Sequence, residues 1–388
     1  MSDVQWCSGS QRFTILDAPI FDSGEEQLGC SASTSACAML VEEPLVELLF
    51  RDDQLLRMRA PPQTPDPPNF YVADAGNKGA GMFAARDIPA GALILVDRPV
   101  VIVPSDIDPE SCTWKRDAFD ALIPRVSSRS RERLLALANV HPLEDNPVVE
   151  GIALTNAFGV DLVLPPVSEQ EYGGIFPDIS RANHCCGLNT AIKWDPETFS
   201  VWMYSLRDVR AGEEIHNQYI DVLAPRDERR AELARYKFTC MCPHCDLPDA
   251  EAVARSDAAR AELRHWRNLY TRFEPWAEDM CRADDTVINS SLRALGLVEQ
   301  EGLWGMQVPF MEDIALSYAV LGDEVQFRVW AEKVVVLCRG QDPKRAARFS
   351  RWLEDPKSYK RWGWRAKQRA LLDKQRAHSA DIDMAVPW

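Results

Sequence analysis

The sequence predicts an α+β protein in which small β-sheets come first and helices follow. Short runs of β-branched and apolar residues alternate with glycine-containing turns between residues 70 and 225. From about residue 250 the apolar residues recur with the period of an α-helix. Several cysteines lie between these regions, at residues 240–245. We therefore expect a strand-rich domain, a cysteine-rich segment and an all-α C-terminal domain.

The composition of the 388-residue chain is typical of a globular protein. Apolar residues make up 46% and charged residues 27%, which suffices for one large or two ordinary cores. The formal net charge is −15, an acidic balance that repels nucleic acid and attracts basic partners. Solubility alone produces the same balance in many proteins. We expect a basic protein or peptide as the substrate partner and no direct nucleic-acid binding, while the oligomeric state is not indicated.

The distribution of apolar residues and cysteines bears on location. No uninterrupted apolar window reaches the ~18 residues of a membrane span, so no membrane association is expected. Residues 1–16 lack the pattern of a secretory signal. The eleven cysteines, an odd number, favour free thiols or metal binding in a reducing compartment. We expect the protein in the cytoplasm or the nucleus.

Residues 1–69 are interpreted as an N-terminal extension that ends in a proline-rich linker. Residues 23–35 have a loop-like composition, and residues 44–58 are leucine-rich and favour a helix. Five prolines then fall within residues 61–68. Prolines at this density exclude a helix and disfavour strand pairing.

The strand-rich region contains six strand-like stretches and one helical stretch. The strand-like stretches are residues 70–72, 93–103, 152–154, 191–194, 201–204 and 215–219. Residues 111–150 carry an apolar stripe at residues 134–138 and are interpreted as a helical insert.

The C-terminal region, residues 250–388, shows the clearest helical pattern. Phe327, Ala331, Val334 and Cys338 recur at helical spacing, and a similar stripe precedes them. Gly322-Asp323 separates the two stripes, which predicts a helical hairpin.

The cysteine segment has the spacing C-x-C-x-x-C. Its members are Cys240, Cys242 and Cys245. Thiolates are good zinc ligands, and a structural zinc site needs four ligands. The fourth could be His244 nearby or one of the distant Cys185 and Cys186. Three unrelated buried thiols are the alternative, because cysteine is often buried.

Three further segments have side chains suited to ligand binding. Residues 78–83 contain two glycines two positions apart, which alone indicates an ordinary hairpin turn, since the rest of a dinucleotide-binding motif is missing. Residues 179–189 contain an Asn-His pair that could bind a purine edge or a carboxylate. Residues 212–219 end in a tyrosine, whose hydroxyl could orient an amine in a dry pocket. Each segment alone is more often structural.

The four motifs in this order resemble those of SET-domain lysine methyltransferases, in particular the group related to the SET-and-MYND proteins. The matching stretches are KGAGMFAARDIPAG, ISRANHCC, GEEIHNQYID and FTCMCPHC, and the resemblance spans about residues 70–247. It implies a SET fold of small β-sheets at residues 70–225, with the helical insert at about residues 111–150. It further implies a post-SET zinc-binding segment at residues 226–249, before the helical C-terminal domain.

The resemblance also implies a binding site for S-adenosylmethionine as the methyl donor. The implied cofactor-binding residues are Lys78, Gly79, Ala80, Gly81, Asn156, Asn183, His184, Tyr236 and Phe238. The glycine-rich turn would line the methionine end of the cofactor. Asn183 and His184 would hold its carboxylate and adenine edge, and Phe238 would stack on the adenine beside Tyr236.

The catalytic residue implied by the resemblance is Tyr219, at the channel where the methyl group is transferred. A free lysine has a pKa near ~10.4 and is mostly protonated at neutral pH. An apolar channel would lower that pKa, and Tyr219 would orient the neutral amine. The implied fourth ligand of the structural zinc ion is Cys186, together with Cys240, Cys242 and Cys245.

The sequence departs from the pattern of this family at three places. Cys185 replaces the usual serine, Leu188 replaces the usual proline, and no MYND finger lies between residues 103 and 151. Three alternatives therefore stay open: a SET fold that has lost methyl transfer and acts as a binding protein, one that methylates a small molecule, or a zinc-binding interaction module. The last leaves the ordered motifs unexplained. Neither the substrate nor the degree of methylation can be predicted.

Overall fold

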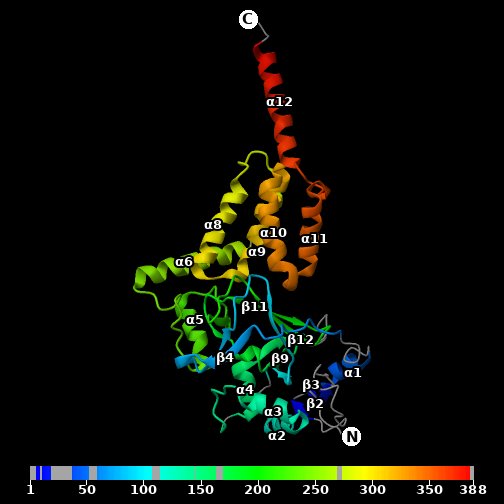
Figure 1. The fold of residues 1–388 in the computed structure, drawn as a ribbon, viewed down its shortest axis with the longest axis vertical. Coiled ribbons are helices and arrows are strands. Elements are labelled where there is room, and N and C mark those ends of the chain that lie inside the picture. Colours follow the sequence, from blue (N-terminus) through cyan, green and yellow to red (C-terminus); the bar gives the residue numbers. More distant parts are fainter. Residues whose placement is uncertain are drawn as a thin grey trace.

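A computed structural model describes residues 6–8, 11–18, 37–51, 59–106, 114–144, 146–162, 169–268 and 273–384. The loop expected at residues 23–35, and residues 52–58 of the expected helix, lie outside these ranges. The strands form a body of three sheets, and the C-terminal helices stand on one end of it (Figure 1). Small sheets followed by helices confirm the predicted fold class. No helix in the described ranges is long and apolar enough to cross a bilayer.

A six-stranded sheet joins the first strands of the chain to the central region. Its order is β1 (Trp6–Ser8), β2 (Gln11–Ala18), β3 (Cys37–Glu42), β7 (Val101–Pro104), β9 (Tyr172–Ile175) and β8 (Phe158–Val160). Strand β3 is buried at every residue and pairs in parallel with β7, Ala38 lying opposite Val101. A strand covered on both faces is an unbroken apolar run without alternation, so its sequence gives little strand signal. The sheet therefore crosses the boundary that the sequence suggested at residue 69. Helix α1 (Glu43–Arg51) follows β3.

Two smaller sheets bring the sequence motifs together. One has the order β10 (Asn183–His184), β13 (Glu214–Asn217), β5 (Ala80–Ala84) and β4 (Phe70–Asp74). Strand β13 pairs with β5 on one side and with β10 on the other, so the glycine-rich, Asn-His and tyrosine segments become neighbours. The other sheet has the order β11 (Thr190–Asp195), β12 (Ser200–Ser205) and β6 (Leu93–Asp97).

Three helices between β7 and β8 cover the six-stranded sheet. They are α2 (Lys115–Asp120), α3 (Ser128–Leu135) and α4 (Val148–Asn156). Phe119, Leu134 and Ile152 pack there against Val101 and Ile175 of the sheet. The strand predicted at residues 152–154 was wrong, since these residues belong to α4. Val149 and Ile152 are buried three positions apart, which is helical spacing, but so short an apolar run does not reveal its period.

The C-terminal half is helical. Helix α5 (Arg226–Leu233) precedes the cysteine segment, and the later helices are α6 (Ala250–Asn268), α7 (Phe273–Glu278), α8 (Thr286–Glu301), α9 (Gln307–Leu321), α10 (Glu324–Gln341), α11 (Pro343–Glu354) and α12 (Trp364–Met384). The predicted hairpin is confirmed, because Gly322 ends α9 with a φ of 80° and the Asp323 side chain caps α10 at the Gln326 N–H. The predicted stripe of α10, from Phe327 to Cys338, is buried against α9 and α11.

A buried ion pair ties the helices to the strand-rich body. Arg260 of α6 and Glu301 of α8 lie 3.1 Å apart with almost no exposure. Ser256 donates to Glu301 at 2.6 Å, and Arg260 also donates to the carbonyl of Cys186. Because a buried charge is tolerated only when it is paired and hydrogen-bonded, this network fixes α6 and α8 against the loop that carries Cys186.

Candidate functional site

A cavity of about 800 Å³ lies where the sequence motifs meet. All but one of the predicted cofactor-contacting residues line it: Lys78, Gly79, Ala80, Asn156, Asn183, His184, Tyr236 and Phe238, together with Tyr219. Residues 136–140 of the helical insert form another part of the wall, which the sequence analysis did not identify. Six separate stretches of the chain therefore enclose one space large enough for a small organic ligand.

The glycines of residues 79 and 81 are required by this geometry. Gly79 has a φ of 73°, which strains any residue with a side chain. Gly81 lies directly behind the cavity wall, where a Cβ would come within 2.7 Å of Ala75 and 3.0 Å of the Asn183 amide nitrogen. The two glycines thus let the turn pack closely against the Asn-His segment.

A charged network lies on the wall of the cavity. Glu214 forms ion pairs with Lys78 and, at 3.1 Å, with His216, and accepts a hydrogen bond from the Asn183 amide at 3.0 Å. Burial alone would raise the pKa of Glu214, but the bonds from His216, Lys78 and Asn183 outweigh it and lower the pKa to about 2. Sequence reasoning missed Glu214 and His216. Their alternate positions on one strand, which place both on the same face, were the available signal.

The Asn-His pair is held by bonds within the protein. The Asn183 amide donates to Glu214 and to the Ala80 carbonyl at 3.3 Å. The ring of His184 accepts from the Tyr219 backbone N–H at 3.2 Å and contacts the Cys186 sulfur at 3.3 Å. Burial lowers the pKa of His184 to about 4, so the ring is neutral at pH 7 and both its nitrogens are engaged. The expected contact of Asn183 and His184 with the carboxylate and adenine edge of the cofactor stays a prediction.

Asn156 lies at the end of α4 and joins the insert to the cavity. Its amide donates to the carbonyls of Ala138 and Ile152 at 2.7 and 2.8 Å. The amide oxygen of Asn156 is therefore the group that could accept a hydrogen bond from a ligand.

Tyr219 is half-buried and its hydroxyl has a fixed direction. The O–H donates to the Ala182 carbonyl at 3.1 Å, and the ring packs 5.1 Å from that of Tyr236. Burial, followed by the nearby Tyr236 and Glu214, raises the pKa of Tyr219 above its usual range. The phenol therefore stays protonated at neutral pH.

A second and a third cavity continue beyond Tyr219. The second, about 180 Å³, shares Asn156, Tyr219 and Tyr236 with the first. It shares Phe158, Gly159 and Gln218 with the third, which measures about 480 Å³. The three cavities thus form a series in which Tyr219 occupies the narrow middle.

The third cavity lies between the strand-rich body and the C-terminal helices, and its walls are mostly apolar. It is lined by side chains of β11 and β12, including Ala191, Ile192 and Trp194, and by Leu303 and Met306 of the helical region. The acid on its wall, Asp221, is paired with Arg264 at 3.0 Å. An apolar groove of this kind suits an apolar side chain of a bound partner.

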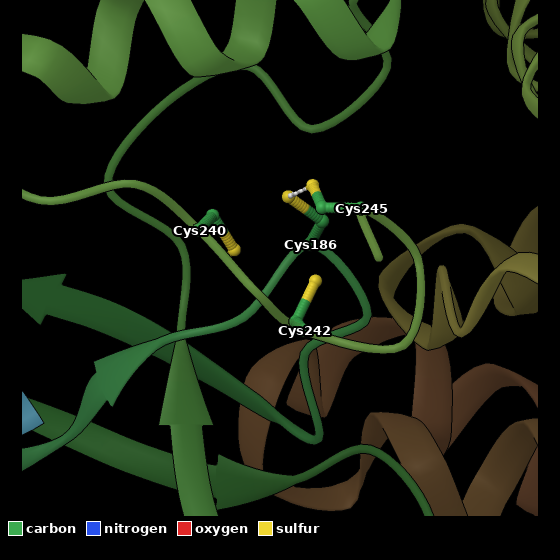
Figure 2. Close-up of side chains that lie close together, drawn as sticks. All are labelled: Cys186, Cys240, Cys242 and Cys245. Atoms are coloured by element: carbon green, nitrogen blue, oxygen red, sulfur yellow. Dashed lines mark hydrogen bonds between the residues drawn. The ribbon is translucent and has the colours of Figure 1, made fainter. Parts of the chain in front are cut away.

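Four cysteine sulfurs converge beside the first cavity (Figure 2). They belong to Cys186, Cys240, Cys242 and Cys245 and all lie within 4.8 Å of one another. A tetrahedral zinc ion with ~2.3 Å bonds to sulfur would set the sulfurs ~3.8 Å apart, so the donor set fits zinc. Cys185 and His244, the other ligands that the spacing allowed, are not among the four. The thiol of Cys185 accepts from the Gly187 N–H, and the His244 ring packs against Gly187 and Gly302.

A buried arginine accompanies the cysteines. Arg229 of α5 lies 3.8 Å from the Cys245 sulfur and donates to the carbonyls of Ala224 and His244. Burial alone would lower the pKa of Arg229, but the sulfurs of Cys186 and Cys245 outweigh it and raise the pKa. A fixed positive charge would offset the negative charge of four thiolates around zinc. No sequence motif marked this residue.

The segments that form the first cavity lie in a region that is similar in sequence to known proteins. Residues 79–220 match the SET domain family. The histone-lysine N-methyltransferase set5 of Schizosaccharomyces pombe is 27% identical over 296 residues, which cover 75% of this chain and 85% of that protein. Human SMYD3, a histone-lysine N-methyltransferase, is 36% identical over 40% of this chain and 34% of its own length. Human SMYD2, an N-lysine methyltransferase, is 29% identical over 26% of this chain and 25% of its own length.

The chain thus spans most of set5 but only about a quarter to a third of the two SMYD proteins. The matched domain covers the glycine-rich turn, the Asn-His segment and Tyr219. Residues 79–220 are thus similar to the SET domain family, and the chain is similar to the set5 and SMYD lysine methyltransferases.

Proposed function

We propose that this protein transfers a methyl group from S-adenosylmethionine to the side-chain amine of a lysine in a protein substrate. The observation that carries the proposal is the position of Tyr219. It lies in the second cavity, here called the narrow cavity, between the first cavity, called the polar chamber, and the third, called the apolar groove. A donor and an acceptor can enter from opposite sides and meet there. Such alignment is the main task of an enzyme whose donor is already reactive.

The polar chamber is the proposed donor site. S-adenosylmethionine, when bound, supplies a methyl group on a positively charged sulfur. Phe238 would cover the adenine, the turn at Lys78 to Ala80 would border the methionine end, and Asn183 would stand beside it. The close packing of the turn at Gly81 against Asn183 and the position of Asn156 on the chamber wall support this placement.

The narrow cavity would prepare the acceptor lysine. A lysine side chain that fills this cavity would exclude water from it, which disfavours the ammonium form and lowers the pKa of the lysine, so the proton would leave to water before transfer. Tyr219 stays neutral, because burial raises the pKa of its phenol. Its O–H is directed to the Ala182 carbonyl, which leaves the hydroxyl oxygen to accept an N–H of the amine. The lone pair of the amine nitrogen would thereby be free to accept the methyl group that bound S-adenosylmethionine would supply.

The four cysteines are proposed to hold a structural zinc ion. Cys240 and Cys242 follow directly after Phe238 and line the same chamber as it does. Cys186 follows directly after the Asn-His pair and Cys185. A metal bound by these residues would fix both walls of the donor site relative to each other.

The apolar groove is the proposed entrance for the substrate. A peptide lying there would place its lysine in the narrow cavity and a neighbouring apolar side chain between Trp194 and Met306. The net charge of −15 supports a basic protein as the substrate, because the opposite charge favours the encounter. Charge would thus govern approach, and the groove would govern the residue beside the lysine.

The proposal is tested by the transfer of labelled methyl groups from S-adenosylmethionine to basic proteins, to lysine peptides and to small-molecule extracts. We expect label on protein lysine. The Tyr219→Phe variant should turn over at least ~100-fold more slowly, as when one oriented hydrogen-bonding group is removed from a catalytic site. Label in the small-molecule fraction alone, or unchanged turnover by the variant, would contradict the proposal.

A further inference from the structure

Charge is distributed very unevenly along this acidic chain. The whole chain has 44 Lys and Arg against 59 Asp and Glu, but residues 343–376 contain twelve Lys and Arg and only three Asp and Glu. These residues form α11, the short turn after it and most of α12. The net charge of the whole chain therefore conceals a strongly positive C-terminal end.

Part of this charge is used within the fold. Five arginines form ion pairs with acids of the preceding helices and turns: Arg345 and Arg348 with Glu312, Arg361 with Glu274, and Arg365 and Arg369 with Asp284. The other seven cations are exposed and form no ion pair with any described residue: Lys344 at the start of α11 and, farther along the chain, the six residues Arg351, Lys357, Lys360, Lys367, Lys374 and Arg376. We call these six residues the basic surface.

The part of the basic surface on α12, formed by Lys367, Lys374 and Arg376, lies apart from the acidic body (Figure 1). Helix α12 projects away from the other helices and from all three sheets (Figure 1). Its 21 residues correspond to a length of roughly 30 Å. Exposed charges are screened over ~10 Å at moderate salt, so the acids of the body do not cancel the field around α12. An anionic partner therefore meets a positive surface at this end of the molecule.

The chemistry of the surface distinguishes between the possible anionic partners. Its exposed large apolar side chains are Trp364 and Leu371, and they lie two turns apart among charged residues. A protein partner usually needs a continuous apolar core at the interface, and a membrane needs a continuous apolar face. A phosphate backbone needs only spread positive charge. Lys367 and Lys374 are seven positions apart, which places both on one side of the helix.

We propose that the basic surface docks the protein onto the phosphate backbone of duplex nucleic acid. Docking itself does not depend on the methyl-transfer site. If the proposed function also holds, the molecule combines an acidic body that attracts basic proteins with a basic end that binds nucleic acid. This would bring the enzyme to basic proteins bound along a nucleic acid. The expectation of no direct nucleic-acid binding rested on the net charge alone, whereas the placement of the charges favours the opposite.

The test is fluorescence anisotropy with a short labelled DNA duplex and the full chain, titrated at several salt concentrations. We expect binding at about 50 mM salt whose affinity falls steeply as salt rises. The Lys367→Glu/Lys374→Glu variant should bind at least ~10-fold more weakly, with a salt dependence reduced by about two counterions. The matched control is Arg129→Glu/Arg210→Glu, which changes the net charge equally at exposed sites of the strand-rich body. It should lose less than ~2-fold.

Each outcome of these titrations either supports or overturns docking on nucleic acid. Equal losses of duplex affinity in the two double variants would mean that binding depends on net charge alone, which would overturn the proposal. An absence of binding at low salt would overturn it as well. Tighter binding to polyglutamate or to anionic vesicles than to the duplex would also overturn it, in favour of an acidic protein or a membrane. Comparable binding to an RNA duplex supports it, because the phosphate chemistry is the same. Unchanged thermal unfolding and peptide methylation by both variants confirm that they fold.

Discussion

The two sides of Tyr219 are built in different ways. The donor side is a chamber of about 800 Å³ whose walls carry Lys78, Glu214 and Asn183 and which borders four cysteines. The acceptor side is a groove of about 480 Å³, walled by apolar side chains of the small sheet and of the C-terminal helices. One side thus fixes a ligand by oriented polar groups, and the other by shape and burial.

This difference matches the tasks of the two sides. A donor with charged and aromatic parts is held by hydrogen bonds of defined direction. An acceptor lysine must lose its proton and reach the donor in line, for which a dry and narrow passage suffices. The comparison predicts that the two sides can be damaged separately.

Loss of the metal site should cause the largest effect, and on the donor side. We expect Cys242→Ser to lower bound zinc well below one ion per chain and to weaken S-adenosylmethionine binding by at least ~10-fold, because the metal holds Phe238 in place. Metal analysis measures the bound zinc, and calorimetry measures the affinity for S-adenosylmethionine. Cys281→Ser, at an exposed cysteine remote from the cluster, is the control. If Cys242→Ser bound the cofactor as tightly as this control does, the chamber would not depend on the metal.

Filling the apolar groove should damage the acceptor side alone. Ala191→Phe places a ring in the groove, and the loss of one apolar subsite typically costs ~10-fold to ~200-fold in specificity. We expect KM for a protein or peptide substrate to rise by at least ~10-fold while the Kd for S-adenosylmethionine stays within ~2-fold. Ala366→Phe, at an exposed site on α12, is the control. A matching loss of cofactor affinity would mean that the two sides are not independent.

The donor side was accessible to sequence reasoning, and the acceptor side was not. The glycine-rich turn, the Asn-His pair and the cysteines are short local motifs, since each needs particular residue types for backbone or donor geometry. Groove residues such as Ile192, Leu303 and Met306 come from distant segments and share only apolar character. No local pattern separates them from core residues, so only the packing of the helices on the sheet reveals them.

The elements of the fold likewise divide into those that the sequence predicts and those that it does not. The α9–α10 hairpin was predictable, because Gly322 and Asp323 mark its turn and the apolar stripe repeats over several turns. Strand β3 and the helical state of residues 152–154 were not, because short buried segments lack a readable period. Arg229 acts on cysteines that are remote from it in sequence, which also leaves no local signal.

The smallest predicted effect concerns Glu214 on the donor side. Its pKa in the folded protein is about 2, below the ordinary value of 4.5. As pH falls, the unfolded chain therefore takes up the proton first, and stability present above about pH 4.5 is lost toward pH 2. We expect Glu214→Gln to lose less stability than the wild type between about pH 6 and pH 4, by roughly half a kcal/mol after allowance for solvent screening.

Urea unfolding across this range of pH measures the effect of Glu214→Gln. The exposed Glu232→Gln is the control and should follow the wild type. Parallel pH profiles for wild type and Glu214→Gln would show that the ion pairs of Glu214 with Lys78 and His216 contribute nothing to folding.

Calorimetric titration of S-adenosylmethionine into zinc-loaded wild type and Tyr219→Phe tests the central claim most directly. The phenol lies at the passage between the two sides and bonds to Ala182, so its removal should leave the chamber intact. We predict saturable binding with one site per chain and a Kd that agrees within ~2-fold between the two proteins. An absence of binding heat in the folded wild type, or a Kd that collapses in the variant, would contradict the account of a donor chamber that meets its acceptor at Tyr219.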